Sequence, residues 1–232
     1  MQNYSDLLSH LREIDLANQI GSLLGWDQEV IMPKNGAESR AEHLAWISKT
    51  VHEKITDPRI GELITSLEVE DLDEIQRANV RISKKAHQRA TCLPSDFVED
   101  FARLRSQAHH TWAEAREKDD FSLFRDDLSK ILDMTRRKAE YFGYTDSPYN
   151  ALLDQYETGL TVGRLDPLFK GLRDSVSPLV RLVSESGVTP DNKWVDGVNW
   201  PKKSQEMLSQ RVSESIGFDF NSGRRDSSVH PF

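Results

Sequence analysis

Histidine and glutamate spacing is the first feature of this sequence that could carry chemistry. A zinc site on one helical face usually needs two histidines four residues apart, with a glutamate after the first. His52 and Glu53 begin this pattern, but Thr56 stands where the second histidine is required. His109 and His110 are adjacent, so on a helix their side chains point roughly 100° apart. We therefore expect no metal site and no catalytic residue within this chain.

Nucleophilic catalysis is not indicated either, because there is no Gly-x-Ser-x-Gly motif and the glycines are scattered singly. Cys92 precedes Leu93-Pro94 at an expected corner between helices, where a buried structural thiol is favoured over a reactive one. Trp112, followed by Ala113, Ala115 and Arg116, is either a core residue, which helical spacing favours, or the wall of a ligand site.

Two segments are harder to explain by packing alone. The first runs from Leu24 to Pro33 and holds Trp26-Asp27-Gln28-Glu29; a packed corner anchored by Trp26 is the favoured interpretation. The second is the C-terminal segment 217–232, which ends in Val-His-Pro-Phe. A histidine before a proline is biased toward extended backbone. It follows an Arg- and Asp-rich turn, as many substrate-facing loops do.

The elements that must position these residues are helices. Apolar residues recur at three-to-four spacing, and runs of β-branched residues with period two are absent. The pattern predicts an all-α chain of about eight to ten helices with a non-helical C-terminal tail, and no internal boundary within 1–232. The first long helix is expected at the N-terminus. The later long helices are expected at about 37–55, 71–90, 95–118, 122–142, 162–186 and 201–217. Shorter helices follow residues 58 and 148, and Pro178 is expected to kink or split its helix.

Composition excludes several classes of partner. The 232 residues carry a net charge of −8, whereas nucleic-acid binders are usually basic. With 37% hydrophobic and 29% charged residues the chain is expected to be globular. One cysteine fits a reducing compartment. No signal peptide and no apolar stretch of membrane-spanning length is recognisable. We expect a cytoplasmic protein with no nucleic-acid and no membrane partner.

The two segments together resemble the carboxypeptidase Taq family of zinc metallocarboxypeptidases. The resemblance continues along essentially the whole chain, and only Arg225 stands where an apolar residue is expected. It rests on Leu23-Leu24-Gly25-Trp26-Asp27-Gln28-Glu29, Met32-Pro33, Glu38-Ser39-Arg40, Leu93-Pro94, Trp112 with Ala115-Arg116, Asp120-Phe121 with Phe124, Pro148-Tyr149 with Leu152-Leu153-Asp154, Gly217-Phe218-Asp219-Phe220 with Gly223-Arg224, and His230-Pro231-Phe232.

The resemblance implies a cleft-containing helical fold and removal of single C-terminal residues from peptides by zinc-activated water. In that family the His-Glu-x-x-His zinc motif, a glutamate ligand and an Asp-x-Arg-x-Thr motif lie beyond the His-Pro-Phe motif, and none is in this sequence. The chain therefore resembles the N-terminal half only. His230, Pro231 and Phe232 are the implied substrate-binding residues. Zinc or another divalent metal is expected in the full-length form.

Two hypotheses follow for the chain itself. In the first it is the N-terminal half of a metallocarboxypeptidase and is inactive by itself. Its implied partners are then a peptide substrate and the missing C-terminal catalytic half, and a second copy in a homodimer is a further candidate. In the second hypothesis it is a stand-alone helical binding or scaffold protein without catalysis. The sequence does not assign the chain alone as an enzyme.

Overall fold

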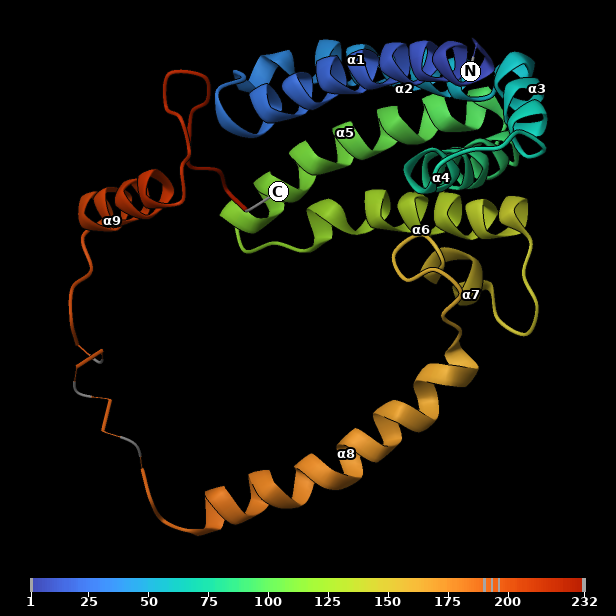
Figure 1. Cartoon of the computed structure of the whole chain (residues 1–232). Coiled ribbons are helices and arrows are strands. Elements are labelled where there is room, and N and C mark those ends of the chain that lie inside the picture. The colour runs from blue at the N-terminus through green and yellow to red at the C-terminus, as the bar shows by residue number, and fades with distance from the viewer. Residues whose placement is uncertain (1, 190, 193, 196, 231–232) are drawn as a thin grey trace. The chain divides into compact units, whose positions relative to one another are not determined.

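The fold is a set of α-helices. The computed structural model describes residues 2–189, 191–192, 194–195 and 197–230, and no strand occurs among them. This confirms the all-α expectation (Figure 1). The elements are α1 (Gln2–Val30), the short 3-10 helix η1 (Lys34–Gly36), α2 (Ala37–Ile55), α3 (Pro58–Leu67), α4 (Glu74–Thr91), α5 (Ser95–Glu117), α6 (Ser122–Phe142), α7 (Pro148–Leu153), α8 (Val162–Glu185) and α9 (Lys202–Ser215).

The chain forms two compact units. Unit 1 contains Met1–Val162 together with Ser228–Phe232, and unit 2 contains Gly163–Ser227. Within unit 1, α2 packs against both α1 and α5, and α5 packs against α6 (Figure 1). The helix α3 lies against α1 and leads into α4. The result is a helical bundle in which α5 has neighbours on two sides.

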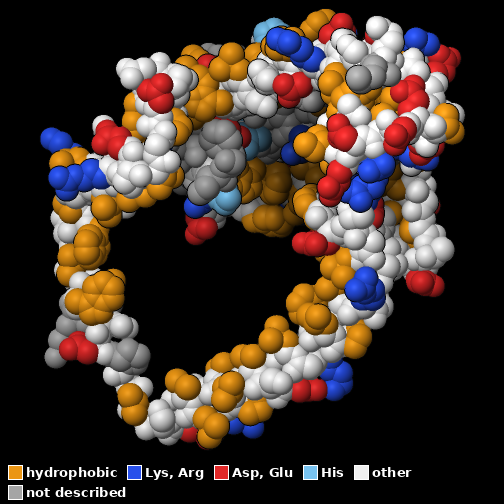
Figure 2. All heavy atoms as spheres, viewed as in Figure 1, with side chains coloured by type: hydrophobic (Ala, Val, Ile, Leu, Met, Phe, Trp, Pro, Cys, Tyr) orange, Lys and Arg blue, Asp and Glu red, His pale blue; other side chains and the backbone are white. Residues whose placement is uncertain are grey.

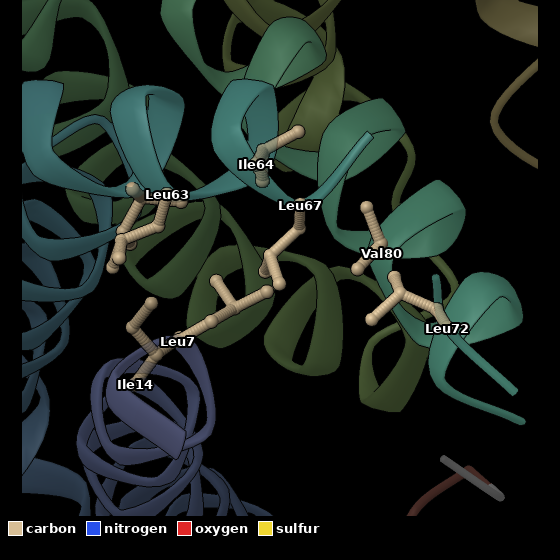
Figure 3. Close-up of a cluster of buried hydrophobic side chains, with 8 residues drawn as sticks. Leu7, Ile14, Leu63, Ile64, Leu67, Leu72 and Val80 are labelled. Atoms are coloured by element: carbon tan, nitrogen blue, oxygen red, sulfur yellow. The ribbon is translucent and has the colours of Figure 1, made fainter. Parts of the chain in front are cut away.

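The core of unit 1 lies where α1, α3 and α4 meet. Leu7 and Ile14 are seven residues apart on α1, so they share one helical face, and both are buried. They pack against apolar side chains of the next helices (Figure 3). Those side chains are Ile60, Leu63, Ile64 and Leu67 of α3, with Leu72 and Val80. Burying each of these residues contributes about 1.5–3 kcal/mol before the entropy of ordering is counted.

Local signals explain where these helices begin. The Asp57 side chain accepts a hydrogen bond from the Arg59 backbone N–H, and Pro58 occupies the first turn of α3. Asp73 and Gln76 form a reciprocal capping box at the start of α4. Gly143 ends α6 with φ of 69°, a conformation that favours glycine.

Two expectations were only partly met. Trp26 was favoured as the anchor of a packed corner; it lies in the last turns of α1, which ends at Val30, and its side chain is only partly buried. Pro178 was expected to kink or split its helix; it does not split α8, which is one continuous element that also contains Pro167. A proline removes one intrahelical hydrogen bond, and the helix can continue when the flanking bonds are kept.

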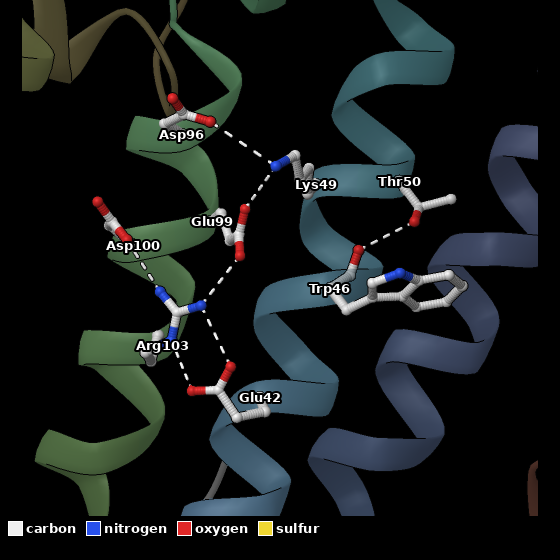
Figure 4. Close-up of polar contacts among 8 residues, drawn as sticks. All are labelled: Glu42, Trp46, Lys49, Thr50, Asp96, Glu99, Asp100 and Arg103. Carbon is white, nitrogen blue, oxygen red and sulfur yellow. Dashed lines mark hydrogen bonds and ion pairs between the residues drawn. The ribbon is translucent and has the colours of Figure 1, made fainter.

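An ion-pair network joins α2 to α5. Lys49 of α2 binds Glu99 of α5 at 2.8 Å, and Arg103 of α5 binds Glu99 at 2.9 Å (Figure 4). Arg103 also binds Glu42 of α2 at 2.7 Å. Hydrogen bonds from Lys49, and then from Arg103, lower the pKa of the Glu99 carboxyl group. The network therefore stabilises the seam only while its carboxyl groups are ionised.

We expect this seam to make the protein acid-sensitive. A carboxyl group whose pKa is lower in the folded state stabilises the fold above its unfolded pKa, about 4.3 for glutamate. That contribution is lost as the pH falls through the folded pKa. Glu99→Gln should therefore lower the urea midpoint at pH 7, and its difference from wild type should shrink below about pH 4. Glu157→Gln, which changes an exposed glutamate outside the network, is the control. A Glu99→Gln difference that is the same at pH 7 and pH 3 would contradict this account.

Unit 2 consists of α8, α9 and the segments after each of them. The region 187–200 is non-helical at its described positions, as expected for a loop. In the turn after α9, the Asp219 carboxylate accepts hydrogen bonds from the Asn221 backbone and the Ser222 hydroxyl. These bonds lower the pKa of Asp219. Neither α8 nor α9 has a buried residue, so unit 2 has no core of its own among the described residues.

Candidate functional site

One of the predicted substrate residues, His230, lies beside α5. The His230 ring centroid is 5.8 Å from that of Trp112, and the rings meet edge-on at 80°. Nη1 of Arg116 donates a hydrogen bond to the Val229 carbonyl oxygen at 3.5 Å, which holds the segment before His230. The His230 side chain is exposed. The other two predicted positions, Pro231 and Phe232, lie outside the described residues, so their role stays a prediction.

Three side chains of α5 form the surface that His230 meets. His109, Trp112 and Arg116 follow one another at spacings of three and four residues, so they share one helical face. The His109 and Trp112 ring centroids are 5.6 Å apart, and the Arg116 guanidinium lies 5.6 Å from the Trp112 centroid. Trp112 was favoured as a core residue, but it is only half-buried and lines a cavity. The ligand-wall alternative therefore describes it better.

The end of α1 reaches the same face of α5. The Glu29 carboxylate lies 2.9 Å from Nε2 of His109, and both side chains are largely buried, at 14% and 26% exposed. The Ser106 hydroxyl and the Gln28 side-chain oxygen are hydrogen-bonded at 2.5 Å. The two segments that stood out in the sequence, 24–33 and 217–232, thus both contribute residues beside α5.

A second ion pair holds the end of α1 in place. Arg40 of α2 binds the Asp27 carboxylate and also donates to the Leu24 carbonyl oxygen. The Arg40 side chain is 14% exposed and that of Asp27 is 28% exposed. Removing one partner of a mostly buried pair leaves the other without compensation. The pair therefore holds the end of α1, which carries Gln28 and Glu29, against α2.

A cavity of about 790 Å³ lies between the end of α1 and α5. Its lining carries charges of both signs, including Glu29, His109 and Arg116, and the Val229 backbone segment closes part of it. Mixed hydrogen-bond donors and acceptors in a cavity can bind a peptide backbone and orient it. The volume falls within the range usual for small-ligand sites. Trp112 does not line this cavity; it lines the neighbouring one, and His109 lines both.

The described residues do not fit a metal ion. No group of three or more His, Cys, Asp or Glu side chains among them is arranged to hold one. The imidazole nitrogens of His52 lie 3.1 Å from the Ser95 hydroxyl and 3.1 Å from the Ala90 carbonyl oxygen, so this buried histidine joins α2 to the α4–α5 corner. Cys92 was expected to be buried but is exposed; its Sγ donates to the Gln88 carbonyl oxygen.

Sequence reasoning missed the pairing of Glu29 with His109. It treated the two adjacent histidines only as metal-ligand candidates. A usable signal was present, since His109 stands three residues before Trp112 and seven before Arg116. Which acidic residue would face that stripe depended on how α1 packs beside α5, and local spacing does not encode this.

None of the helices described, measured by length and hydropathy together, could serve as a membrane span.

Comparison with known proteins covers nearly the entire chain. A family model described as carboxypeptidase Taq (M32) metallopeptidase matches residues 6–232. Carboxypeptidase 1 of Bacillus subtilis is 37% identical over 224 residues, covering 96% of this chain and 44% of the relative. Thermostable carboxypeptidase 1 of Pyrococcus furiosus is 32% identical, covering 100% of this chain and 47% of the relative. The chain thus spans about half the length of these curated relatives.

Solved structures give the same coverage. The BsuCP crystal structure matches with a TM-score of 0.93 and 35% identity, over 100% of this chain and 47% of that chain. A structure of the Pyrococcus furiosus carboxypeptidase matches with a TM-score of 0.81 and 32% identity, again over 47% of that chain.

Proposed function

Because this chain belongs to the carboxypeptidase Taq (M32) metallopeptidase family, we propose that it is the N-terminal portion of a metallocarboxypeptidase that removes C-terminal residues from peptides. The relatives that support this are carboxypeptidases by name, and the chain corresponds to about half of each. In this proposal residues 1–232 supply one helical half and a wall of the substrate cleft. The remaining half supplies the catalytic groups, so the chain alone is inactive.

The apolar face of α8, which nothing within unit 2 buries, is the structural observation that carries the proposal. Figure 2 shows apolar side chains along this helix. The most exposed include Leu168, Leu179 and Val183, at 61%, 59% and 67% exposed. On α9, Leu208 is 64% exposed and Ile216 is 80% exposed. Proteins that are complete by themselves rarely leave contiguous apolar patches of this kind uncovered. A further part of the same protein is the simplest cover, given that the relatives are about twice as long.

We propose His230, Pro231 and Phe232 as substrate-binding residues and assign no catalytic residue to this chain. The contact between His230 and Trp112 supports a place at the cleft wall. Zinc or another divalent metal would bind in the remaining half, since the described residues offer no ligand group. One cysteine in the sequence is compatible with the cytoplasm as the location.

Complementation tests this function. The completing half is defined here as the part of Bacillus subtilis carboxypeptidase 1 that this chain does not match. The chain alone should bind no stoichiometric metal and hydrolyse no peptide, because a hydrolytic site usually needs three protein ligands and an open position. Mixed with the completing half, it should raise chelator-sensitive release of the C-terminal residue from a blocked tripeptide above the rate of either half alone. Chromatographic detection of that residue measures the rate.

Variants of α8 provide the control. Leu172→Glu with Leu179→Glu should prevent complementation, because both leucines lie on the exposed apolar face. Arg181→Glu introduces a comparable charge change on the same helix and should be tolerated. A monodisperse chain that binds no hydrophobic dye and ignores the completing half at micromolar concentration would instead favour the stand-alone binding or scaffold protein. Tight binding of one zinc by the chain alone, with chelator-sensitive hydrolysis, would also contradict the proposal.

A further inference from the structure

Two cavities in unit 1 share three lining residues. The first, about 710 Å³, lies among α1, α2, α4, α5 and α6, and the second, about 530 Å³, lies among α5, α6 and the α7 region. Arg105 of α5, Lys138 of α6 and Gln155, which follows α7, line both cavities. These three side chains therefore mark the place where the two cavities adjoin.

Positive charge at this place is not balanced. Arg89, which lines the first cavity, is paired with the Asp154 carboxylate. Arg105 and Lys138, by contrast, form no ion pair or hydrogen bond within the described part of the chain. The Lys138 ammonium lies 5.6 Å from the Phe142 ring centroid. Burial lowers the pKa of Lys138, and the neighbouring charges of Arg105 and Arg89 lower it further. An anion between the two cations would relieve both costs.

The remaining lining describes the rest of the ligand. Five of the thirteen residues that line the second cavity carry aromatic rings, namely Phe101, Trp112, Phe124, Tyr149 and Tyr156. These rings favour a flat apolar group, and a guanidinium beside an ammonium favours a carboxylate.

We propose that Arg105 and Lys138 form a binding site for a carboxylate carried on an aromatic or apolar body. The carboxylate lies between the two cations, and the apolar body occupies the aromatic-walled cavity. Its source is either a free organic acid or an acidic side chain on an apolar segment of the remaining half. The two cations do not line the cavity beside Glu29, although His109 lines both that cavity and the aromatic-walled one. Binding of a carboxylate by the two cations does not depend on the proposed peptidase activity.

Calorimetric titration of the 232-residue chain with phenylacetate tests the site. Phenylacetate should bind saturably, and its neutral analogue phenylacetamide should bind at least about tenfold more weakly, since it lacks the charge. Arg105→Gln and Lys138→Gln should each weaken phenylacetate binding by about tenfold. The charge-conserving variants Arg105→Lys and Lys138→Arg should retain most of the affinity. Binding by these variants also shows that a glutamine variant fails because it lacks the charge and not because the position tolerates no substitution.

Two further α6 cations serve as matched controls. Lys130→Gln and Arg136→Gln remove a lysine and an arginine from α6, but these residues line neither cavity and are paired with Asp127 and Asp133. Equal affinity for phenylacetate and phenylacetamide would overturn the proposal. It would also be overturned if the control variants weakened binding as much as Arg105→Gln and Lys138→Gln do. The result of the titration is independent of complementation, because the titration uses the chain alone.

A repeat titration with the completing half present identifies the source of the carboxylate. Displacement of phenylacetate supports the site and assigns its carboxylate to a side chain of that half. Undiminished binding supports the site as a receptor for a free acid.

Discussion

Replacing Leu67 by alanine should lower the free energy of unfolding of unit 1 by about 2–5 kcal/mol. Leu67 is 0% exposed and packs in the cluster that joins α1, α3 and α4. Alanine removes buried apolar contacts and leaves a cavity that rigid helices can only partly close. Urea unfolding followed by circular dichroism measures the change.

The matched control for this prediction is Leu23→Ala. Leu23 is on α1 and is 63% exposed, so the same chemical change should alter the unfolding free energy by no more than about 0.5 kcal/mol. If Leu67→Ala costs less than about 1 kcal/mol while the helical signal is unchanged, the α1–α3–α4 cluster is not the stabilising core of this unit.

The second large effect is expected at His230. In the complex of this chain with the completing half, His230→Ala should lower kcat/KM by about a hundredfold, the scale seen when one positioned donor is removed from a reaction site. We propose His230 as a substrate-binding residue, and its ring lies against Trp112. Metal content and the affinity between the halves should stay the same. Initial rates on a blocked tripeptide, with metal analysis of the same samples, measure these quantities.

His43→Ala is the control for His230→Ala. His43 is an exposed histidine on α2 that lines none of the cavities described above. Its loss should leave kcat/KM unchanged. If His230→Ala abolishes assembly, the residue has a structural role at the junction. If neither kcat nor KM changes, the substrate-binding assignment of His230 is wrong for this chain.

Most helices could be predicted because their signals are local. The range 37–55 was predicted and is observed for α2, where apolar positions repeat at helical spacing and Asn35-Gly36 precedes the first turn. The range 122–142 was also predicted and is observed for α6, which ends at Gly143. Backbone hydrogen bonding, capping and turn residues act within a few positions, so a single sequence is enough to recognise them.

Burial of individual residues was less predictable. Cys92 was expected inside and is exposed, and Trp112 was expected in the core and is half-buried. The helix that holds Trp112 and the corner that holds Cys92 were both predicted, but which side of a helix or corner is covered depends on its neighbours. That choice is made by packing across the bundle and not by propensity.

The candidate site shows the same division. The sequence alone determined that the chain is helical, that it contains no His-Glu-x-x-His pattern, and that it resembles the family whose model matches residues 6–232. Only the tertiary structure decided that Glu29 faces His109, that His230 meets Trp112, and that Arg105 and Lys138 adjoin two cavities. The physical reason is range: helix formation depends on residues three or four positions apart, whereas these contacts bring together residues that are distant in the chain, through the packing of separate helices.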